Sequence, residues 1–374
     1  MNTVIIIPTL DPGEGICQLV EELRVLGFCR FIVVDDGSSE SRDPLFAKLE
    51  RSGACVLHHA ANLGKGAAIK TALAAMVRLF PEATHAITVD GDGQHLPADV
   101  KRVCLAAEEN CERIVIGTRN LKGKNVPLRS RFGNAFSSAY FKLDTGFTCP
   151  DTQTGLRAIP ASLIPLALSV EGSRYEYEMN LLTTAAKKGI PLEMVPIETV
   201  YVDNNAGSHF STVQDSVRIY RQLIRFAGSS LTCSLIDLAL FAFVTALLNL
   251  EVAVMVALAT VTARMASGVL NFTLNRTWSF ADAGSSDGDA RMQAIRYAIL
   301  FFAQMAASAS LVTLLSWLPL PLVGVKIAID GTLFIASYFI QRNWVFKRSA
   351  RTRAFVMKGG AHEENASRNS FPAV

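Results

Sequence analysis

Several features are scarce in this sequence, and each scarcity argues against a class of protein. Seven cysteines occur in 374 residues without a CxxC pair, so we expect reduced, mostly buried thiols rather than disulfides or a zinc site. The net charge is only +3, and no basic stripe is interleaved with aromatic residues, which argues against nucleic acid as a partner. No basic segment precedes the short apolar run at the N-terminus. We therefore expect no signal peptide and a cytosolic first domain.

Charged residues make up only 18% of the chain, and they are unevenly distributed. Residues 1–224 mix charged and apolar residues as a globular domain does, whereas residues 227–346 form long apolar runs. The length is also too great for one ordinary domain. We therefore predict a globular domain over 1–224, an apolar domain over 225–348, and a tail over 349–374 that is basic and then disordered.

In the first part, short apolar runs alternate with stretches of helical periodicity. The apolar runs are 4–8, 31–39, 54–60, 85–93 and 113–119, and the helical stretches include 13–26 and 64–80. This alternation predicts βαβ units and an α/β fold with a mostly parallel sheet. Ligands of such sheets bind at the carboxyl ends of the strands.

Acidic residues follow three of these strands and should meet at one edge. They are Asp11, Asp35, Asp36, Asp90 and Asp92. Gly91 lets the backbone turn sharply and approach a ligand, and the two flanking carboxylates are hard ligands suited to Mg²⁺ or Mn²⁺. A calcium loop fails because Gln94 and His95 stand where an acid and a glycine are needed. A solvated acidic turn stays open as the plainer interpretation.

The segment NLGKGAAIKTAL at 62–73 resembles a phosphate loop but does not match its pattern. Lys65 stands between Gly64 and Gly66 at a predicted helix start, where the amino end of a helix favours an anion. Nucleotide contact and a plain helix cap are both compatible with this segment.

The apolar part contains four stretches long enough to span a bilayer, at about 227–249, 252–274, 295–318 and 321–341. Basic residues lie on one side of these spans, and the short turns 249–251 and 319–321 on the other. This asymmetry predicts cytoplasmic termini and a cytoplasmic first domain. Four buried helices of a soluble protein are the alternative.

The apolar part also repeats itself. RFAGSSL at 225 and RYAILFF at 296 open its halves, and NRTWSF at 275 and QRNWVF at 341 close them. Two spans per half predict a parallel repeat, with Trp278 and Trp344 as interfacial anchors. Ionisable residues inside the spans are Asp237, Arg264, Lys326 and Asp330. They either hold the bundle together as charge pairs, such as Lys326 with Asp330, or contact a lipid-phosphate head group.

Six motifs together resemble a known family. They are PTLDPGEG, VVDDGSSE, NLGKGAAIKTAL, VDGDGQH, IGTRN and DTQTGLRAIP, in that order. This order is similar to that of family 2 glycosyltransferases with the GT-A fold, especially the polyprenyl-phosphate (dolichol-phosphate mannose synthase-like) branch. The resemblance covers residues 1–224. Residues 225–348 resemble a GtrA-like membrane domain with four spans.

The resemblance implies roles for individual residues. The nucleotide-sugar site would comprise Pro8, Thr9, Asp11, Asp35, Asp36, Lys65, Asp90, Gly91, Asp92 and Asp151. The metal, Mg²⁺ or Mn²⁺, would be held by Asp90, Asp92 and Gln94. Contacts to the acceptor phosphate would come from Arg119, Arg129, Arg131, Ser208 and His209. Asp92, Arg119 and Arg131 would be the catalytic residues, although a membrane-facing basic patch accounts for Arg129 and Arg131 equally well.

The implied reaction transfers a sugar from a UDP- or GDP-linked donor to polyprenyl (undecaprenyl) phosphate, with inversion at the anomeric carbon. A lipid phosphate is already ionised at pH 7, so the acceptor needs no general base. The alternatives are a membrane domain that also flips the product, and a sugar nucleotidyltransferase. The sequence names neither the sugar nor the base, and it leaves homo-oligomer formation open.

Overall fold

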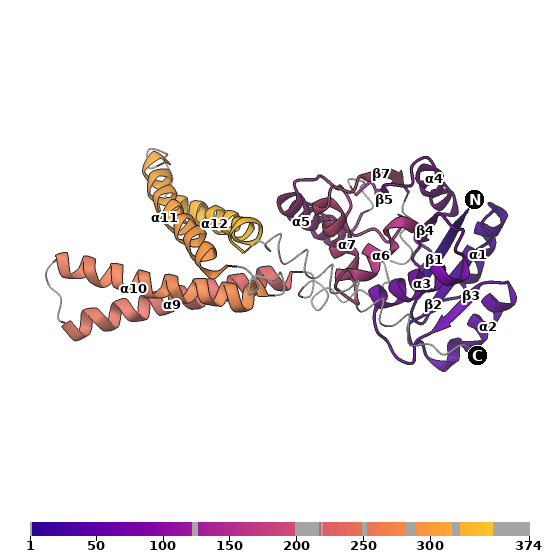
Figure 1. The fold of residues 1–374 in the computed structure, drawn as a ribbon, viewed down its shortest axis with the longest axis horizontal. Coiled ribbons are helices and arrows are strands. Elements are labelled where there is room, and N and C mark those ends of the chain that lie inside the picture. Colours follow the sequence, from indigo (N-terminus) through magenta and orange to yellow (C-terminus); the bar gives the residue numbers. More distant parts are fainter. Residues whose placement is uncertain are drawn as a thin grey trace. The chain divides into compact units, whose positions relative to one another are not determined.

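A computed structural model describes residues 2–121, 126–198, 217, 220–248, 253–281, 289–315 and 322–346. The chain divides into two compact units, Met1–Ile219 and Tyr220–Val374 (Figure 1). Ser208, His209 and the tail over 349–374, for which the sequence makes predictions, lie outside the described residues.

The first unit is built on a seven-stranded sheet with the order β3-β2-β1-β4-β6-β5-β7. The strands are β1 Thr3–Thr9, β2 Phe31–Asp35, β3 Cys55–His58, β4 His85–Thr88, β5 Ile114–Arg119, β6 Arg157–Pro160 and β7 Leu192–Ile197. Only β6 runs antiparallel to its described neighbours, β4 and β5. The prediction of an α/β fold with a mostly parallel sheet is confirmed.

The strands β6 and β7 were not predicted, and their sequences explain why. Each contains a proline, Pro160 or Pro196, which weakens the strand signal. The edge position of β7 tolerates its proline, because an edge strand need not donate every backbone hydrogen bond.

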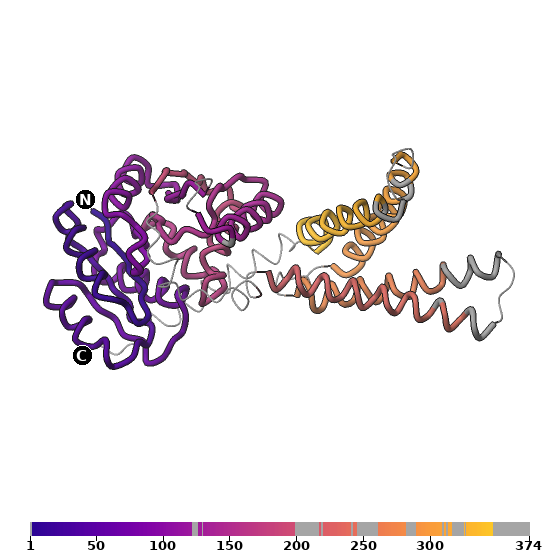
Figure 2. The backbone as a smooth tube through the Cα atoms, turned by 180° about the vertical axis from the view of Figure 1, so that it is seen from behind, coloured from indigo at the N-terminus to yellow at the C-terminus, as the bar shows by residue number. Residues whose placement is uncertain are grey.

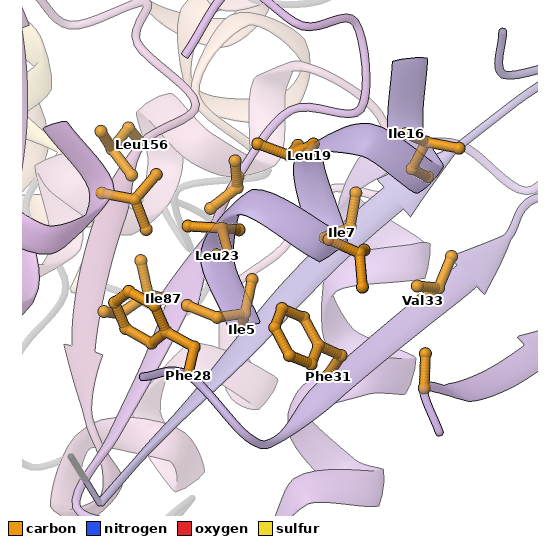
Figure 3. Close-up of a cluster of buried hydrophobic side chains, with 14 of the residues drawn as sticks. Ile5, Ile7, Ile16, Leu19, Leu23, Phe28, Phe31, Val33, Ile87 and Leu156 are labelled. Carbon is orange, nitrogen blue, oxygen red and sulfur yellow. The ribbon is translucent and has the colours of Figure 1, made fainter. Parts of the chain in front are cut away.

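Helices cover both faces of the sheet. They are α1 Gly15–Val25, α2 Asp43–Arg51, α3 Lys65–Leu79, α4 Pro97–Glu108, α5 Leu128–Thr145, α6 Ile164–Ser169 and α7 Glu176–Lys187. Successive residues of β1 point to opposite faces, so Ile5 and Ile7 enter one hydrophobic core while Val4 and Ile6 enter the other. Figure 3 shows Ile5 and Ile7 in the first of these cores, together with Leu19 and Phe31.

Strand register brings the polar strand ends together. Thr9 pairs with Asp35, and Asp35 pairs with His58. On the other side of β1, Ile6 pairs with Thr88, and the Val89 amide donates to the Ile6 carbonyl at 2.9 Å. Asp11, Asp36 and Asp90 therefore follow adjacent strands at the same edge of the sheet.

The second unit is helical. Its helices are α9 Arg221–Leu248, α10 Ala253–Leu274, α11 Ala290–Leu315 and α12 Leu322–Ile340. Figure 2 shows α9 running beside α10, and α11 beside α12. Among the described residues, Arg221–Val244 and Ala290–Leu315 are long and apolar enough to cross a membrane. These bounds lie close to the predicted spans.

The two helix pairs repeat each other in detail. Each pair ends in one turn of π-helix, Asn275–Ser279 or Gln341–Val345. Arg225 at the start of the first pair donates to the Trp278 carbonyl at 3.4 Å, and Arg296 donates to the Trp344 carbonyl at 2.9 Å. The predicted internal repeat is thus present in the contacts as well as in the sequence.

The halves meet through equivalent residues. The Asn275 amide donates to Gln341 Oε1 at 3.0 Å, and the rings of Phe280 and Phe346 stack with centroids 5.2 Å apart. Each of these pairs joins one residue of the first closing motif to its counterpart in the second.

Candidate active site

A cavity of about 490 Å³ opens at the carboxyl edge of the sheet in the first unit. Its walls come from segments around residues 8–15, 62–68 and 90–93, with Arg174 and Tyr175 closing one side. Eight of the predicted site residues line it: Pro8, Thr9, Asp11, Asp36, Lys65, Asp90, Gly91 and Asp92.

The strongest electrostatic feature of the cavity is a chain of three charged groups. Lys65 Nζ lies 2.7 Å from Asp90 Oδ1 and 2.9 Å from Glu178 Oε2. Burial opposes ionisation of Lys65, but the two carboxylates overcome it and raise the pKa of the ammonium above its usual value. Burial likewise opposes ionisation of Asp90, whereas Lys65 and His95 hold the pKa of its carboxyl well below its usual value. The lysine is therefore a fixed cation next to the predicted metal ligand.

The surroundings of Asp90 are close-packed. His95 Nε2 lies 3.4 Å from Asp90 Oδ2, and its buried Nδ1 has no hydrogen-bond partner among the described residues. A Cβ built on Gly155 would collide with both carboxylate oxygens of Asp90. Gly155 is part of the DTQTG motif, so one use of that motif is to leave room for the aspartate.

Asp92 is less well compensated than Asp90. Burial and the nearby Asp90 charge raise the pKa of the Asp92 carboxyl, and the Gln94 backbone amide donates to Oδ1 at 3.1 Å. A cation at this position would relieve the repulsion between the two carboxylates.

The donor set fits a divalent cation shared with a phosphate ligand. Asp90 and Asp92 both reach the cavity, and hard oxygen ligands suit Mg²⁺ or Mn²⁺. In the described part of the chain no group of three or more His, Cys, Asp or Glu residues is arranged to hold a metal. Two carboxylates alone match the way Mg²⁺ is bound, with the remaining ligands coming from water and substrate phosphates.

Asp36 lines the cavity but also has a structural task. Its carboxylate accepts hydrogen bonds from the backbone amides of Leu63 at 2.9 Å and Gly64 at 2.7 Å, and it contacts His59 Nδ1 at 2.7 Å. These bonds fix the amino end of α3 and thereby place Lys65. The sequence predicted contact with the nucleotide and not this second task.

Asp35 and Asp11 both accept hydrogen bonds from the segment that follows β2. Asp35 is buried, accepts from the Ser38 amide at 2.8 Å and contacts His58 at 2.8 Å. Asp11 has a positive φ of 44°, and its carboxylate accepts from the Ser39 amide and hydroxyl. Asp11 reaches the cavity, whereas Asp35 is not among its described lining residues.

The glycines around Lys65 serve packing. A Cβ on Gly64 would lie 2.5 Å from the Ser173 carbonyl oxygen, and one on Gly66 would lie 2.5 Å from Tyr177 Cβ. The segment before α7 packs closely against both glycines, and the nucleotide contact suggested for this loop stays a prediction. That segment brings Arg174 and Tyr175 to the cavity, and the first turn of α7 brings Glu178 to Lys65. The sequence assigned no role to Arg174, Tyr175 or Glu178.

Arg119 and Asp151 form a pair of their own. Arg119 donates from Nε to Asp151 Oδ2 at 2.6 Å and from Nη2 to Oδ1 at 3.0 Å, and Asp151 is fully buried. Neither residue is among the described residues that line the cavity. The sequence assigned Arg119 to a phosphate and Asp151 to the sugar and did not foresee their pairing.

The other predicted acceptor residues are only partly described. Arg131 lies exposed on α5. The side chain of Arg129 and both Ser208 and His209 fall outside the described residues. Their roles therefore stay predictions.

The cysteines are all free thiols. Cys104, Cys149 and Cys233 are buried, whereas Cys29 and Cys111 are exposed and the other two are half-buried. The prediction of mostly buried thiols is therefore correct for three of the seven.

Two family models match this chain. Residues 4–159 match Glycosyl transferase family 2, and residues 225–346 match the GtrA/DPMS transmembrane domain. A protein of Methanocaldococcus jannaschii is 30% identical over 53% of this chain and 82% of its own length, and has no assigned activity.

Two relatives have named activities. The UDP-N-acetylglucosamine–dolichyl-phosphate N-acetylglucosaminyltransferase of Methanococcus voltae is 29% identical over 61% of this chain and 97% of its own length. The undecaprenyl-phosphate 4-deoxy-4-formamido-L-arabinose transferase of Proteus mirabilis is 26% identical over 54% of this chain and 61% of its own length.

Among solved structures, glucosyl-3-phosphoglycerate synthase from Mycobacterium tuberculosis is similar with a TM-score of 0.43 and 16% identity, over 60% of this chain and 77% of that one. With its paired carboxylates at the sheet edge, its family 2 domain and its GtrA/DPMS domain, this chain belongs to glycosyl transferase family 2 and is a membrane glycosyltransferase.

Proposed function

We propose that this enzyme transfers a sugar, with inversion, from a UDP- or GDP-linked donor to polyprenyl phosphate, and that undecaprenyl phosphate is the acceptor. The product, a polyprenyl-phosphate sugar, would serve cell-envelope glycosylation. The observation that carries the proposal is the cavity in which Asp90 and Asp92 face Lys65, in a chain that also has a membrane domain. Relatives that are named as transferases to dolichyl or undecaprenyl phosphate support the choice of acceptor.

We also propose a multi-pass topology with four spans and a cytoplasmic catalytic domain, bounded near residues 224 and 348. The helix α10 has 22 residues and α12 has 19, both sufficient to span a bilayer core. The contacts of Arg225 with Trp278 and of Arg296 with Trp344 bring four helix ends and their arginines to the same side. Arginine on one side supports a cytoplasmic position for that side.

At the nucleotide-sugar side of the reaction, the negative charge of the diphosphate has to be neutralised. The bound Mg²⁺ or Mn²⁺, held by Asp90 and Asp92 with Gln94 beside them, would neutralise the leaving nucleoside diphosphate. Lys65 presents a permanent positive charge at the amino end of α3, where helix amides also favour an anion. Asp36 keeps that helix end in place through the Leu63 and Gly64 amides.

The acceptor end needs cations rather than a base. A lipid phosphate brings its own nucleophilic oxygen anion, so the protein has to hold two anions that repel each other. Arg119, Arg129 and Arg131 are the residues we assign to this task. Asp151 holds the Arg119 guanidinium in a two-point contact and so fixes its direction.

The direct test uses membranes that contain the full chain, Mn²⁺ or Mg²⁺, undecaprenyl phosphate and a panel of radiolabelled nucleotide sugars. Label should enter the organic phase from one donor. Asp92→Ala should lower this transfer by about 10²–10³-fold, because it removes stabilisation of the leaving group. Glu21→Ala, an exposed carboxylate on α1, is the matched control and should retain activity.

Full activity of Asp92→Ala would contradict the metal role. If no donor labels the lipid, either with the unaltered chain or with Glu21→Ala, the assignment of undecaprenyl phosphate as the acceptor is contradicted.

Translocation of the product by the second unit is a second candidate. It is favoured by ionisable groups within the spans, such as Arg264, whose Nε lies 3.6 Å from Asp237 Oδ2, because such groups can contact a lipid-phosphate head group. Replacing the second unit with an unrelated membrane hairpin distinguishes an anchor from a flippase. Export of the product should persist if the second unit only anchors the enzyme, and it should be lost if that unit moves the product across the membrane. We do not propose a sugar nucleotidyltransferase, because the named relatives are sugar transferases.

A further inference from the structure

Arg157 on β6 is a charged side chain that is buried almost completely, with 1% of its surface exposed. Its Nε donates to the Thr154 carbonyl at 3.0 Å, Nη1 to the Glu178 carbonyl at 2.6 Å and Nη2 to the Thr152 carbonyl at 3.1 Å. In the described part of the chain, the guanidinium therefore bonds to three backbone carbonyls and to no carboxylate.

Burial of this charge needs a reason beyond packing. A buried cation without a counter-ion is unfavourable unless hydrogen bonds replace the lost water, and an apolar side chain of similar volume avoids that cost. The planar fork of the guanidinium supplies three charge-assisted bonds in fixed directions. What the arginine provides, and an apolar residue does not, is a fixed geometry among the three carbonyls.

Two of these carbonyls belong to the DTQTG segment, residues 151–155. The same segment contains Asp151, whose carboxylate accepts from the backbone amide of Arg119 at 3.2 Å as well as from its guanidinium. By holding the carbonyls of Thr152 and Thr154, Arg157 holds the stretch of backbone from which Asp151 reaches Arg119.

The third carbonyl belongs to the first turn of α7. It is that of Glu178, whose own carboxylate lies 2.9 Å from Lys65 Nζ. Lys65 in turn lies 2.7 Å from Asp90 in the cavity. Arg157 thus holds the backbone of the residue whose side chain holds Lys65.

We propose that Arg157 is a positioning residue that keeps two parts of the site at a fixed separation. One part is the Arg119–Asp151 pair, and the other is the Lys65–Glu178 pair. A single guanidinium reaches the backbone beneath both pairs, which the one-point ammonium of a lysine does not do.

The consequence for the reaction rests on the proposed function. There, Lys65 faces the diphosphate of the donor and Arg119 faces the phosphate of the acceptor. The separation of these two cations sets the approach of two anions that repel each other, and a small displacement lowers the rate steeply.

The first measurement is amide hydrogen exchange in the full chain carrying Arg157→Lys. We expect several-fold faster exchange in residues 151–156 and 176–179 together, with the β1 amides unchanged. A second variant, Arg157→Gln, buries no charge and keeps the test decisive where the lysine variant does not fold.

The matched control is Ile159→Val. Ile159 is 1% exposed and lies two residues further along β6, so its side chain points to the same face of the sheet as that of Arg157. The valine weakens packing on this strand but leaves the three carbonyl bonds intact. We expect the two segments to exchange in this control as in the unaltered chain.

The second measurement separates kcat from KM in the sugar-transfer assay. Arg157→Lys should lower kcat by about 10–100-fold, because the two cations no longer stand at the required separation. The KM for the nucleotide sugar should change by less than about 3-fold, since the segments around Asp36 and Asp92 do not depend on Arg157. Ile159→Val should leave both constants unchanged.

Unchanged exchange in residues 151–156 and 176–179 of the Arg157 variants would overturn the proposal. An equal fall of kcat in Ile159→Val would overturn it too, because strand stability then accounts for the loss. So would a raised KM with an unchanged kcat, which indicates a role in donor binding alone. If the unaltered chain transfers no sugar, the proposed function fails, and hydrogen exchange still decides whether Arg157 holds both segments.

Discussion

The two units of this protein bury polar groups in different chemical forms. The first unit buries charged side chains: Glu178 is buried and pairs with Lys65, and Asp151 is buried and pairs with Arg119. The buried polar side chains described in the second unit are neutral and include Ser229, Asn275 and Gln341.

The difference follows from the surroundings of each unit. A charge in hydrocarbon has no counter-ion or water to offset its desolvation, whereas an amide needs only hydrogen-bonding partners. At the cavity, a fixed charge is useful because charged ligands enter and leave. The cluster of Lys65, Asp90 and Glu178 therefore lies at the cavity, where charged ligands would bind, whereas the buried amides of the second unit hold its helices together.

Removing the central cation of the first unit should have the largest effect on stability. Lys65→Met leaves the Asp90 and Glu178 carboxylates without their shared partner, and loss of one member of a buried pair costs about 3–5 kcal/mol. Hydrogen exchange of the β1 amides measures this, since the three tryptophans at 278, 317 and 344 all lie in the second unit. Unchanged protection of β1 would contradict the role of Lys65 as a structural counter-charge.

Gly155→Ala should destabilise the first unit by about 2–3 kcal/mol, because the new Cβ collides with the Asp90 carboxylate. It should also lower sugar transfer by displacing that carboxylate. Gly331→Ala is the matched control in the second unit, where nothing lies within 4 Å of the new Cβ. We expect it to be neutral or stabilising. Hydrogen exchange of the β1 amides measures the effect of Gly155→Ala, and the thermal midpoint of tryptophan fluorescence measures that of Gly331→Ala. An equal loss of stability in Gly155→Ala and Gly331→Ala would contradict the expectation that only the first glycine leaves room for a neighbouring side chain.

Asn275→Leu should cost the second unit about 1–2 kcal/mol, since Ser229 and Gln341 both lose a partner. The expected loss is smaller than that for Lys65→Met because no charge is left uncompensated. Tryptophan fluorescence during unfolding in mild detergent measures it. A loss of stability greater than that of Lys65→Met would contradict the expectation that an uncompensated charge costs more than an unpaired amide.

The smallest expected effect depends on pH. Burial alone would raise the pKa of Asp35, but hydrogen bonds from Ser38 and His58 hold it below its usual value. The stabilisation is therefore fully present above pH ~4, and it is lost as the pH falls through the folded-state pKa. His58→Ala should cost about 1 kcal/mol at neutral pH and reduce this acid dependence. Hydrogen exchange of the β2 amides in the variant, compared with the unaltered chain at each pH, measures this change.

The sequence alone determined the sheet edge and the halves of the membrane unit. Apolar runs that end in acids predict buried strands and a convergent polar edge, because both features depend on residues a few positions apart. The same holds for the repeat of NRTWSF and QRNWVF, whose counterparts Asn275 and Gln341 meet in the structure. The prolines in β6 and β7 obscured two strands that the sheet nonetheless accommodates.

Only the tertiary structure decided which charges pair. Lys65 meets Glu178 and Arg119 meets Asp151 across separations of 113 and 32 residues, and no local pattern encodes such contacts. Gly155 likewise makes room for an aspartate 65 positions earlier in the chain. Short-range periodicity fixes which residues reach the edge of the sheet. The partner of each residue there depends on how elements that are distant in the sequence pack against one another.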